Sequence, residues 1–218
     1  ESAETLLKTD SNAHEELSRD LIGCKNWTSL REVLETLNRT CEYVVLRNFD
    51  SFPNDYNLKV HGDIDFLCSD LDAAINILNA KKIYREPHRV HFSISINNET
   101  VPIDIRTLND DYYDPYWSRD ILQSRVKRNG FFIPSDEHHF YSLAYHALIH
   151  KREISQDYAE KFAKLSRDSG LPDYNQQELI TLLQSFMEKN DYLFVRPKDL
   201  SVYFAWDKIS HIDQANYF

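Results

Sequence analysis

The chain has 218 residues, a length that fits one large domain or one domain with an appendage. Its 25 Lys and Arg residues against 35 Asp and Glu residues give a net charge of −10. This balance argues against nucleic acid as the main partner, because neutralising a phosphate backbone requires a basic face. The composition, 42% hydrophobic and 28% charged, is that of a globular domain. No apolar run reaches the ~18 residues of a membrane-spanning helix, so we expect no transmembrane segment.

Glycine and cysteine usage excludes several enzyme classes. The four glycines are too far apart for a GxGxxG fingerprint, a phosphate-binding P-loop or a GxSxG nucleophile elbow. The three cysteines form no CxxC pair, so the sequence predicts neither a structural zinc site nor a disulfide framework. Reduced thiols and the lack of a signal-peptide pattern predict a cytoplasmic protein, and the chain can be one domain of a longer, multidomain protein.

The first half of the chain predicts helices and strands in alternation. A short helix is expected at 14–21, and Ser29 with Glu32 forms a capping box that opens a helix to about residue 38. Apolar runs at 42–47 and 60–68 predict buried strands. Ser69 with Asp72 then predicts the start of a helix that ends near residue 81. The strands that follow are expected at 82–85, 90–96 and 100–107, with a tight turn at 97–99 between the last two.

The second half is predicted to be mostly helical. After an aromatic and acidic loop at 110–117, helices are expected at 117–128, 136–151, 155–168 and 176–189. Residues 191–218 are aromatic but show little periodicity. We therefore predict an α+β fold, with a small mixed β-sheet and flanking helices in residues 1–115 and a helical C-terminal region, residues 116–218, packed on that core.

Two aspartates stand close together in the strand predicted at 60–68. Side chains of a strand alternate between its faces, so Asp63 and Asp65 point to the same side, while Ile64 and Phe66 point into the core. Like charges so close together destabilise a strand unless a cation lies between them, and a divalent metal is the natural candidate. An ordinary pair of acids at a strand end is the alternative interpretation.

A third aspartate, Asp104, stands between Ile103 and Ile105 in the strand predicted at 100–107. If this strand neighbours the Asp63 and Asp65 strand, three carboxylates converge, and such a cluster can hold one or two Mg²⁺ or Mn²⁺ ions for transfer at phosphorus. A structural salt bridge between Asp104 and Arg106 is the alternative.

The segments GDIDFL and IDIR, separated by a capped helix and two strands, resemble the nucleotidyltransferase superfamily of DNA polymerase β and the small antibiotic-modifying nucleotidyltransferases. The segment LRNFDSFP, which precedes GDIDFL, resembles the corresponding region of poorly characterised members found with surface-polysaccharide genes. It is more distantly similar to LicD/fukutin-type transferases, which use CDP-linked donors. The resemblance covers about residues 42–107. It implies that Asp63, Asp65 and Asp104 are the metal-binding and catalytic acids.

One departure from that family concerns the donor phosphates. Members of the family bind these phosphates with a Gly-Ser pair that precedes the acidic strand. This chain has Arg47-Asn48-Phe49-Asp50-Ser51 in that region and no glycine. Arg47 and Asn48 are candidate phosphate donors in its place, and Arg106 can turn from Asp104 towards phosphate. Donor binding that is altered or lost is the other interpretation.

Three further features of the second half carry weaker hypotheses. His139, His146 and His150 can share one stripe of a helix, as zinc ligands, as acid–base groups or simply as a partly buried face. The loop at 110–117 suits either an aromatic substrate wall or packing between the two halves. The basic cluster Arg125, Lys127 and Arg128 suits phosphate or a solvated helix face.

The favoured function is a Mg²⁺-dependent transferase that moves a nucleotidyl group, or a phospho-alditol from a CDP-linked donor, onto a hydroxyl of a small molecule or glycan, as in surface-polysaccharide synthesis. A glycosyltransferase that uses a nucleotide sugar and a DxD metal site is one alternative, although it leaves Asp104 without a role. A non-catalytic module that keeps the fold within a larger protein is the other.

Overall fold

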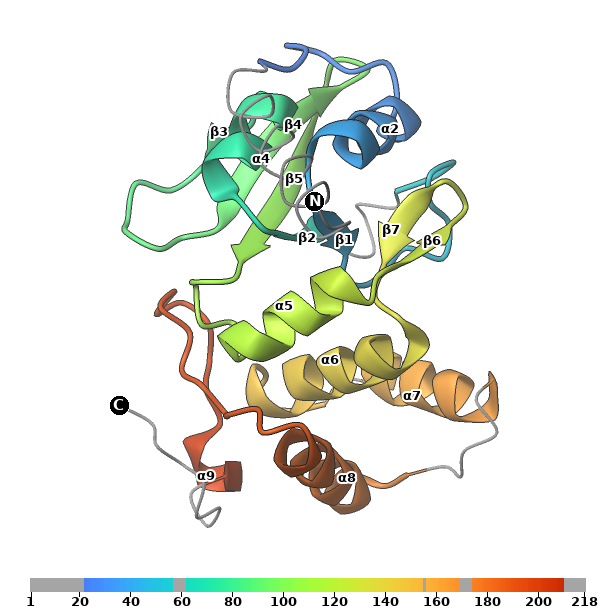
Figure 1. The fold of residues 1–218 in the computed structure, drawn as a ribbon, viewed down its shortest axis with the longest axis vertical. Helices are drawn as coiled ribbons and strands as arrows, with labels where there is room; N and C mark the ends of the chain where they lie inside the picture. The colour runs from blue at the N-terminus through green and yellow to red at the C-terminus, as the bar shows by residue number, and fades with distance from the viewer. Residues whose placement is uncertain (1–21, 57–61, 155, 169–173, 210–218) are drawn as a thin grey trace, which may run out of the picture.

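The computed structural model describes residues 22–56, 62–154, 156–168 and 174–209, so the helix expected at 14–21 lies outside the described residues. Within them the predicted α+β class is confirmed, because a five-stranded mixed sheet and a small two-stranded sheet are combined with helices (Figure 1). The strands are β1 (Tyr43–Val45), β2 (Ile64–Cys68), β3 (Lys81–Lys82), β4 (His91–Ile96), β5 (Glu99–Thr107), β6 (Val126–Arg128) and β7 (Phe131–Ile133).

The five-stranded sheet has the order β1-β2-β5-β4-β3. Its central pair, β2 and β5, is parallel, and every other pair is antiparallel. Strands β4 and β5 form the predicted hairpin, and its turn consists of Asn97 and Asn98 with φ angles of 51° and 64°. Two consecutive positive φ angles match the right-handed twist of the flanking strands, and Asn tolerates that conformation better than most residues.

Two helices, α2 (Leu30–Thr40) and α4 (Leu71–Leu78), cover one face of the sheet. Ser29 caps α2 as predicted, and its side chain accepts a hydrogen bond from the Glu32 amide. The expected cap of α4 was wrong by one residue: Asp70, not Ser69, is the N-cap and accepts from the Ala73 amide. A carboxylate at this position also interacts favourably with the positive end of the helix dipole.

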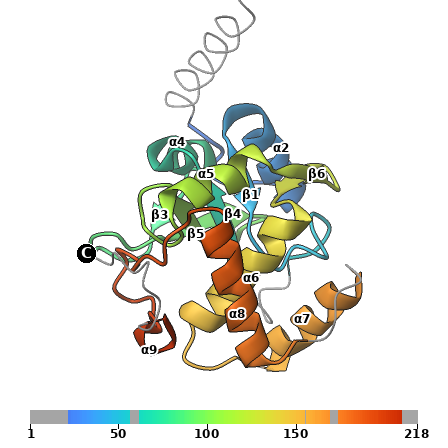
Figure 2. The same ribbon diagram turned by 60° about the horizontal axis from the view of Figure 1, so that its bottom comes forward.

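The opposite face carries the helices of the second half. Figure 2 shows those that follow residue 135 on the side away from α2 and α4. Their apolar side chains form a second core with β1 and β2, to which Val44, Leu46 and Leu67 contribute. No helix among the described residues combines the length and apolar character needed to cross a bilayer. These helices are α5 (Pro115–Gln123), α6 (Asp136–Ile149), α7 (Gln156–Asp168), α8 (Gln176–Lys189) and α9 (Trp206–Ile209).

The helix predicted over 117–128 was wrong at its C-terminal end. It ends at Gln123, and the chain then forms the β6–β7 hairpin around Asn129 and Gly130, whose φ angles are 51° and 92°. The apolar side chains between the sheet and the helices α2 and α4 form the first core of the molecule. Phe131 and Ile133 of this hairpin are buried in it, next to α2 and β1. The hairpin therefore carries part of the second half of the chain around to the α2 side of the sheet.

Candidate functional site

The two acidic strands are direct neighbours in the sheet. Strands β2 and β5 pair in parallel with Asp65 opposite Asp104, and β4 places His91 opposite Asp104 on the other side. The residues that alternate with these aspartates, Ile64 and Ile103, are buried in the first core. The carboxylates consequently point to the other face of the sheet, towards the helices of the second half.

Asp63 joins the pair from the turn just before β2. It follows Gly62, which has a φ of +78° that glycine adopts without strain. Asp63 is half-buried, while Asp65 and Asp104 are 3% and 6% exposed.

All three aspartates line one cavity of about 450 Å³. Its walls come from the strands, from the end of α6 and from the C-terminal segment around residues 201–203, so residues from both halves of the chain surround the acids. The three other residues that the sequence singles out for donor binding also line it. The lining residues are Arg47, Asn48, Asp63, Asp65, His91, Asp104, Arg106, Tyr112, His146, His150, Lys151, Arg152, Tyr158, Ser201, Val202 and Tyr203.

The carboxylates in this cavity repel one another. Burial first, and then the charges of Asp65 and Asp104, raises the pKa of Asp63 to about 7. Burial and the charge of Asp65 raise the pKa of Asp104 to about 6. Asp63 and Asp104 thus hold protons more tightly than isolated carboxyl groups, as expected of carboxyl groups that are buried beside another acid.

Arg47 supplies positive charge next to these acids. Arg47 is 6% exposed, and its guanidinium donates a hydrogen bond to Asp65 and forms a buried ion pair with it. Burial opposes the charge of Arg47, but Asp65 and the tyrosines around it outweigh this effect, and the pKa of Arg47 is raised. The structure therefore places Arg47 on the carboxylate of Asp65.

Arg106 lies on the same face as Asp104, two residues along β5. Its guanidinium is 3.7 Å from Asp104 and stacks 4.0 Å above the ring of Tyr112. Tyr112 in turn forms a hydrogen bond with Nδ1 of His146. The salt bridge between Arg106 and Asp104 that the sequence offered as an alternative is thus present, within the same cavity as the other two acids.

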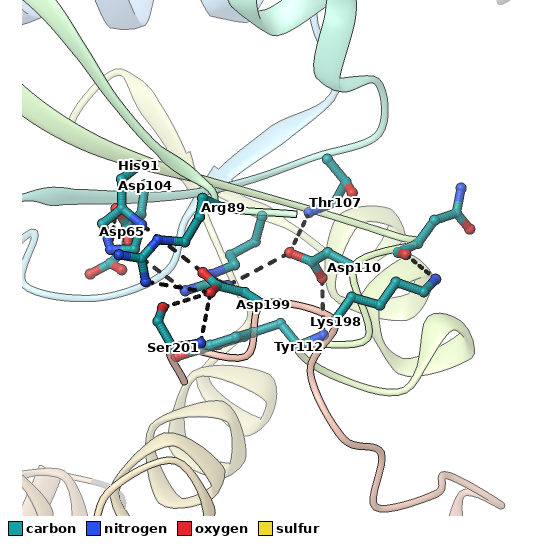
Figure 3. Close-up of polar contacts among 12 residues, drawn as sticks. Asp65, Arg89, His91, Asp104, Thr107, Asp110, Tyr112, Lys198, Asp199 and Ser201 are labelled. Carbon is teal, nitrogen blue, oxygen red and sulfur yellow. Dashed lines mark hydrogen bonds and ion pairs between the residues drawn. The ribbon is translucent and has the colours of Figure 1, made fainter. Parts of the chain in front are cut away.

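Asp199, a buried acid that the sequence patterns do not single out, reaches this region from the C-terminal segment. Asp199 lies within 4.0 Å of Arg89, His91 and Arg106, and it accepts hydrogen bonds from the amide and hydroxyl of Ser201 (Figure 3). Burial alone would raise its pKa, but the hydrogen bonds from Ser201 and the two guanidiniums lower it. In the sequence, Asp199 is marked only by the Asp-x-Ser spacing of a side-chain turn. This pattern occurs in many loops, so it does not identify a site residue.

The three histidines proposed as one stripe of a helix separate into two places. His146 and His150 are buried and line the acidic cavity, whereas His139 packs its ring 4.8 Å from that of Phe49 and lines a different cavity. Burial lowers the pKa of all three, so each is neutral near pH 7. The three histidines follow one face of α6 but lie at different heights along it, so the structure does not bring them together as one set of ligands.

Asn48 stands between these two cavities and lines both. Its φ of 60° turns the chain sharply after Arg47, and its side-chain oxygen accepts a hydrogen bond from Lys161 at 2.9 Å. The second cavity, of about 280 Å³, also contains Arg128 and Lys164.

The remaining candidates have structural partners. Tyr113 and Trp117 of the aromatic loop are buried in the second core, so this loop mainly packs the two halves together, although Tyr112 reaches the cavity. Arg125 forms an ion pair with Glu42 at 3.3 Å. Lys127 and Arg128 lie on β6, so the helix face expected for this basic cluster was wrong.

The acids fit Mg²⁺ or Mn²⁺ in their chemistry, because both ions prefer carboxylate oxygens and because a bound cation would offset the burial and mutual repulsion that raise the pKa values of Asp63 and Asp104. The described residues contain no preformed group of three ligands at metal distance. Binding would therefore require Asp63, Asp65 and Asp104 to move together and Arg47 to share Asp65 with the ion.

Comparison with protein-family models, curated proteins and solved structures finds no match to this chain.

Proposed function

We propose that the protein is a Mg²⁺-dependent transferase of the nucleotidyltransferase type. It moves a nucleotidyl group, or a phospho-alditol from a CDP-linked donor, onto a hydroxyl of a small molecule or glycan. The observation that carries the proposal is the pairing of Asp65 with Asp104 on neighbouring parallel strands, with Asp63 lining the same cavity.

The roles of the residues follow from that placement. Asp63 and Asp65 would bind the metal that neutralises charge on the donor phosphates. Asp104 would bind metal on the side nearer the acceptor hydroxyl. Arg47, Asn48 and Arg106 line the same cavity and can donate hydrogen bonds to phosphate oxygens. Catalysis of this kind consists of positioning and charge neutralisation, without a covalent intermediate on the protein.

The position of Asp104 favours this proposal over a glycosyltransferase. A DxD glycosyltransferase needs only the Asp63 and Asp65 pair, whereas here a third buried carboxylate stands directly opposite Asp65. The ion pair between Arg47 and Asp65 favours a second candidate, a non-catalytic module, because Arg47 compensates one acid without any metal.

Thermal shift measurements with CTP, ATP, UTP and sugar nucleotides, each with and without Mg²⁺, test the two candidates. A transferase predicts a melting temperature that rises only when nucleotide and Mg²⁺ are both present, and whose rise disappears in Asp65→Asn. A flat response over the whole panel, with a folded and monodisperse protein, would support the non-catalytic module.

A further inference from the structure

The cavity that holds the three aspartates has a second wall of opposite charge. This wall comes from the end of α6, where His150, Lys151 and Arg152 follow one another and all line the cavity. Tyr203, from the C-terminal segment, completes it. Two walls of opposite charge around one space are the arrangement expected for a ligand whose anionic groups lie next to a bound cation.

His150 is the first indication that this wall receives a ligand. Its side chain is 3% exposed, and both of its ring nitrogens lack a hydrogen-bond partner among the described residues. Leaving a buried polar group unsatisfied costs on the order of 1–3 kcal/mol, so such groups usually have a reason to persist. A neutral imidazole carries one N–H, which can donate to an anionic oxygen.

Lys151 and Arg152 are the second indication. Both side chains are exposed, although they border the cavity. Arg152 lies 5.1 Å from the ring of Tyr203, a contact that keeps the guanidinium near the cavity mouth. The C-terminal end of α6 favours cations at this place, because the last carbonyl groups carry partial negative charge.

Arg106 is the third indication, and it lies between the two walls. Its Nε and Nη1 atoms are buried without a hydrogen-bond partner among the described residues, although its nearest acids lie at 3.7–4.0 Å. An acid at that distance balances the charge but leaves the N–H groups unpaired. These donors can bind an anion between the aspartates and Lys151.

We infer that His150, Lys151 and Arg152, together with Arg106, form a binding site for the outer phosphate of a donor that contains at least two adjoining phosphates. A cavity of about 450 Å³ has room for a diphosphate and part of the group attached to it. The donor rests on the proposed function; the anion site itself does not.

Calorimetric titration with inorganic pyrophosphate, in EDTA, tests the site without any metal. The decisive variant is the double substitution Lys151→Gln and Arg152→Gln, which removes two exposed charges and leaves the core intact. The control is Lys81→Gln with Lys82→Gln, which removes the same charge from exposed positions on β3, outside the cavity. Melting curves of each variant verify that it is folded.

We expect the wild type and the β3 control to bind pyrophosphate alike, and the α6 double variant to bind at least roughly tenfold more weakly. His150→Phe, which fills a similar space without an N–H, should weaken binding as well. No binding by the wild type, or equal affinity in the α6 double variant and the control, would overturn the inference.

The same titration separates this inference from the proposed function. Asp63→Asn should leave metal-free pyrophosphate binding intact or make it stronger, because it removes a carboxyl group that can repel the anion and leaves the Arg47–Asp65 ion pair in place. If pyrophosphate binds through α6 but no nucleotide responds to Mg²⁺, the transferase proposal fails and the anion site stands. If nucleotides respond to Mg²⁺ but the α6 double variant binds pyrophosphate normally, the anion site fails and the transferase stands.

Discussion

Arg47 determines how the acidic cavity behaves in the absence of a metal. It is buried, it forms an ion pair with Asp65, and it lies 5.8 Å from the ring of Tyr112. A buried ion pair contributes little net stability compared with an apolar pair, but removing only one partner leaves an uncompensated charge. Arg47 and a metal ion would therefore compete for the same carboxylate.

Substituting Arg47 with Met is expected to lower the free energy of unfolding by about 3 kcal/mol in EDTA, because Asp65 is left buried and unpaired. Added Mg²⁺ should restore part of the loss. Chemical denaturation with and without Mg²⁺ measures both effects. Arg31→Met, at an exposed position on α2, should change stability by less than about 1 kcal/mol and not respond to Mg²⁺. An Arg47 variant as stable as the wild type would contradict this view of the site.

Asp63→Asn is expected to stabilise the metal-free protein in a pH-dependent way. The pKa of Asp63 is about 7 in the folded protein against a usual 3.8, so folding favours the protonated form. Stability from this group is complete below pH 3.8 and is lost as the pH rises towards 7. The melting temperature of the variant should exceed that of the wild type by about 2–4 °C at pH 7.5 and match it near pH 4.

Asp55→Asn, at an exposed position that precedes Asp63 in the sequence, is the matched control for this pH series. It should follow the wild type at every pH. A gain in Asp63→Asn that is equal at pH 4 and pH 7.5 would show that the ionisation of Asp63 in its buried, acidic surroundings is not its cause.

Asp104→Ala is expected to separate catalysis from binding. If Asp104 holds the metal nearer the acceptor hydroxyl, the substitution should lower turnover at least about 100-fold. Because Asp63 and Asp65 remain to hold the Mg²⁺ and nucleotide, donor affinity should change less than about threefold. Steady-state kinetics together with calorimetric titration measure the two quantities. Normal turnover would remove Asp104 from the proposed mechanism.

Among the secondary-structure elements, the β6–β7 hairpin best shows what the sequence could and could not predict. Asn129-Gly130 is a strong hairpin signal, but the apolar spacing before it also fits a helix. The spacing therefore predicts a helix up to residue 128, where the structure has strand β6. Strands β4 and β5 were predicted almost to the residue, because their alternation places one clear face in the core. The strand predicted at 60–68 was too long at its start, since β2 begins at Ile64 and leaves Asp63 outside the strand.

Gly130→Ala tests the importance of the hairpin turn. A Cβ at this position meets no atom within 4 Å, so the substitution acts only through the backbone, whose φ is +92°. We expect a loss of about 1 kcal/mol or slightly more in the free energy of unfolding, measured by chemical denaturation. Gly130→Asn should lose less, because Asn adopts positive φ more readily than Ala. Equal losses in the two variants would argue that the turn changes its conformation.

At the scale of the whole molecule, the site depends on contacts between distant parts of the chain. The sequence placed Asp63, Asp65 and Asp104 on two strands, and the parallel pairing of those strands brings them together. The sequence could not predict that His150 lines the same cavity as the aspartates, because helical periodicity does not indicate which cavity the end of a helix borders. Nor could it place Asp199, whose partners Arg89 and Arg106 lie about a hundred residues earlier in the sequence.

Asp199→Asn is expected to loosen the connection between the C-terminal segment and the sheet. The neutral side chain keeps the Ser201 hydrogen bonds but leaves Arg89 and Arg106 with less compensation, which should cost about 2 kcal/mol. Hydrogen exchange should rise in residues 199–205 more than in β2 or β5. Because the pKa of Asp199 is lowered by folding, the difference from the wild type should shrink as the pH falls below about 4.

The cavity walls also impose an order on how the protein is made. Translation proceeds from the N-terminus, so the strands with the three aspartates leave the ribosome long before residues 199–203, which supply Asp199 and part of the far wall. A nascent chain with β2 and β5 already paired would have its acidic face open to water. The ligand site is complete only when this late segment has docked, so a nascent chain should acquire full ligand affinity only after residues 199–203 have left the ribosome.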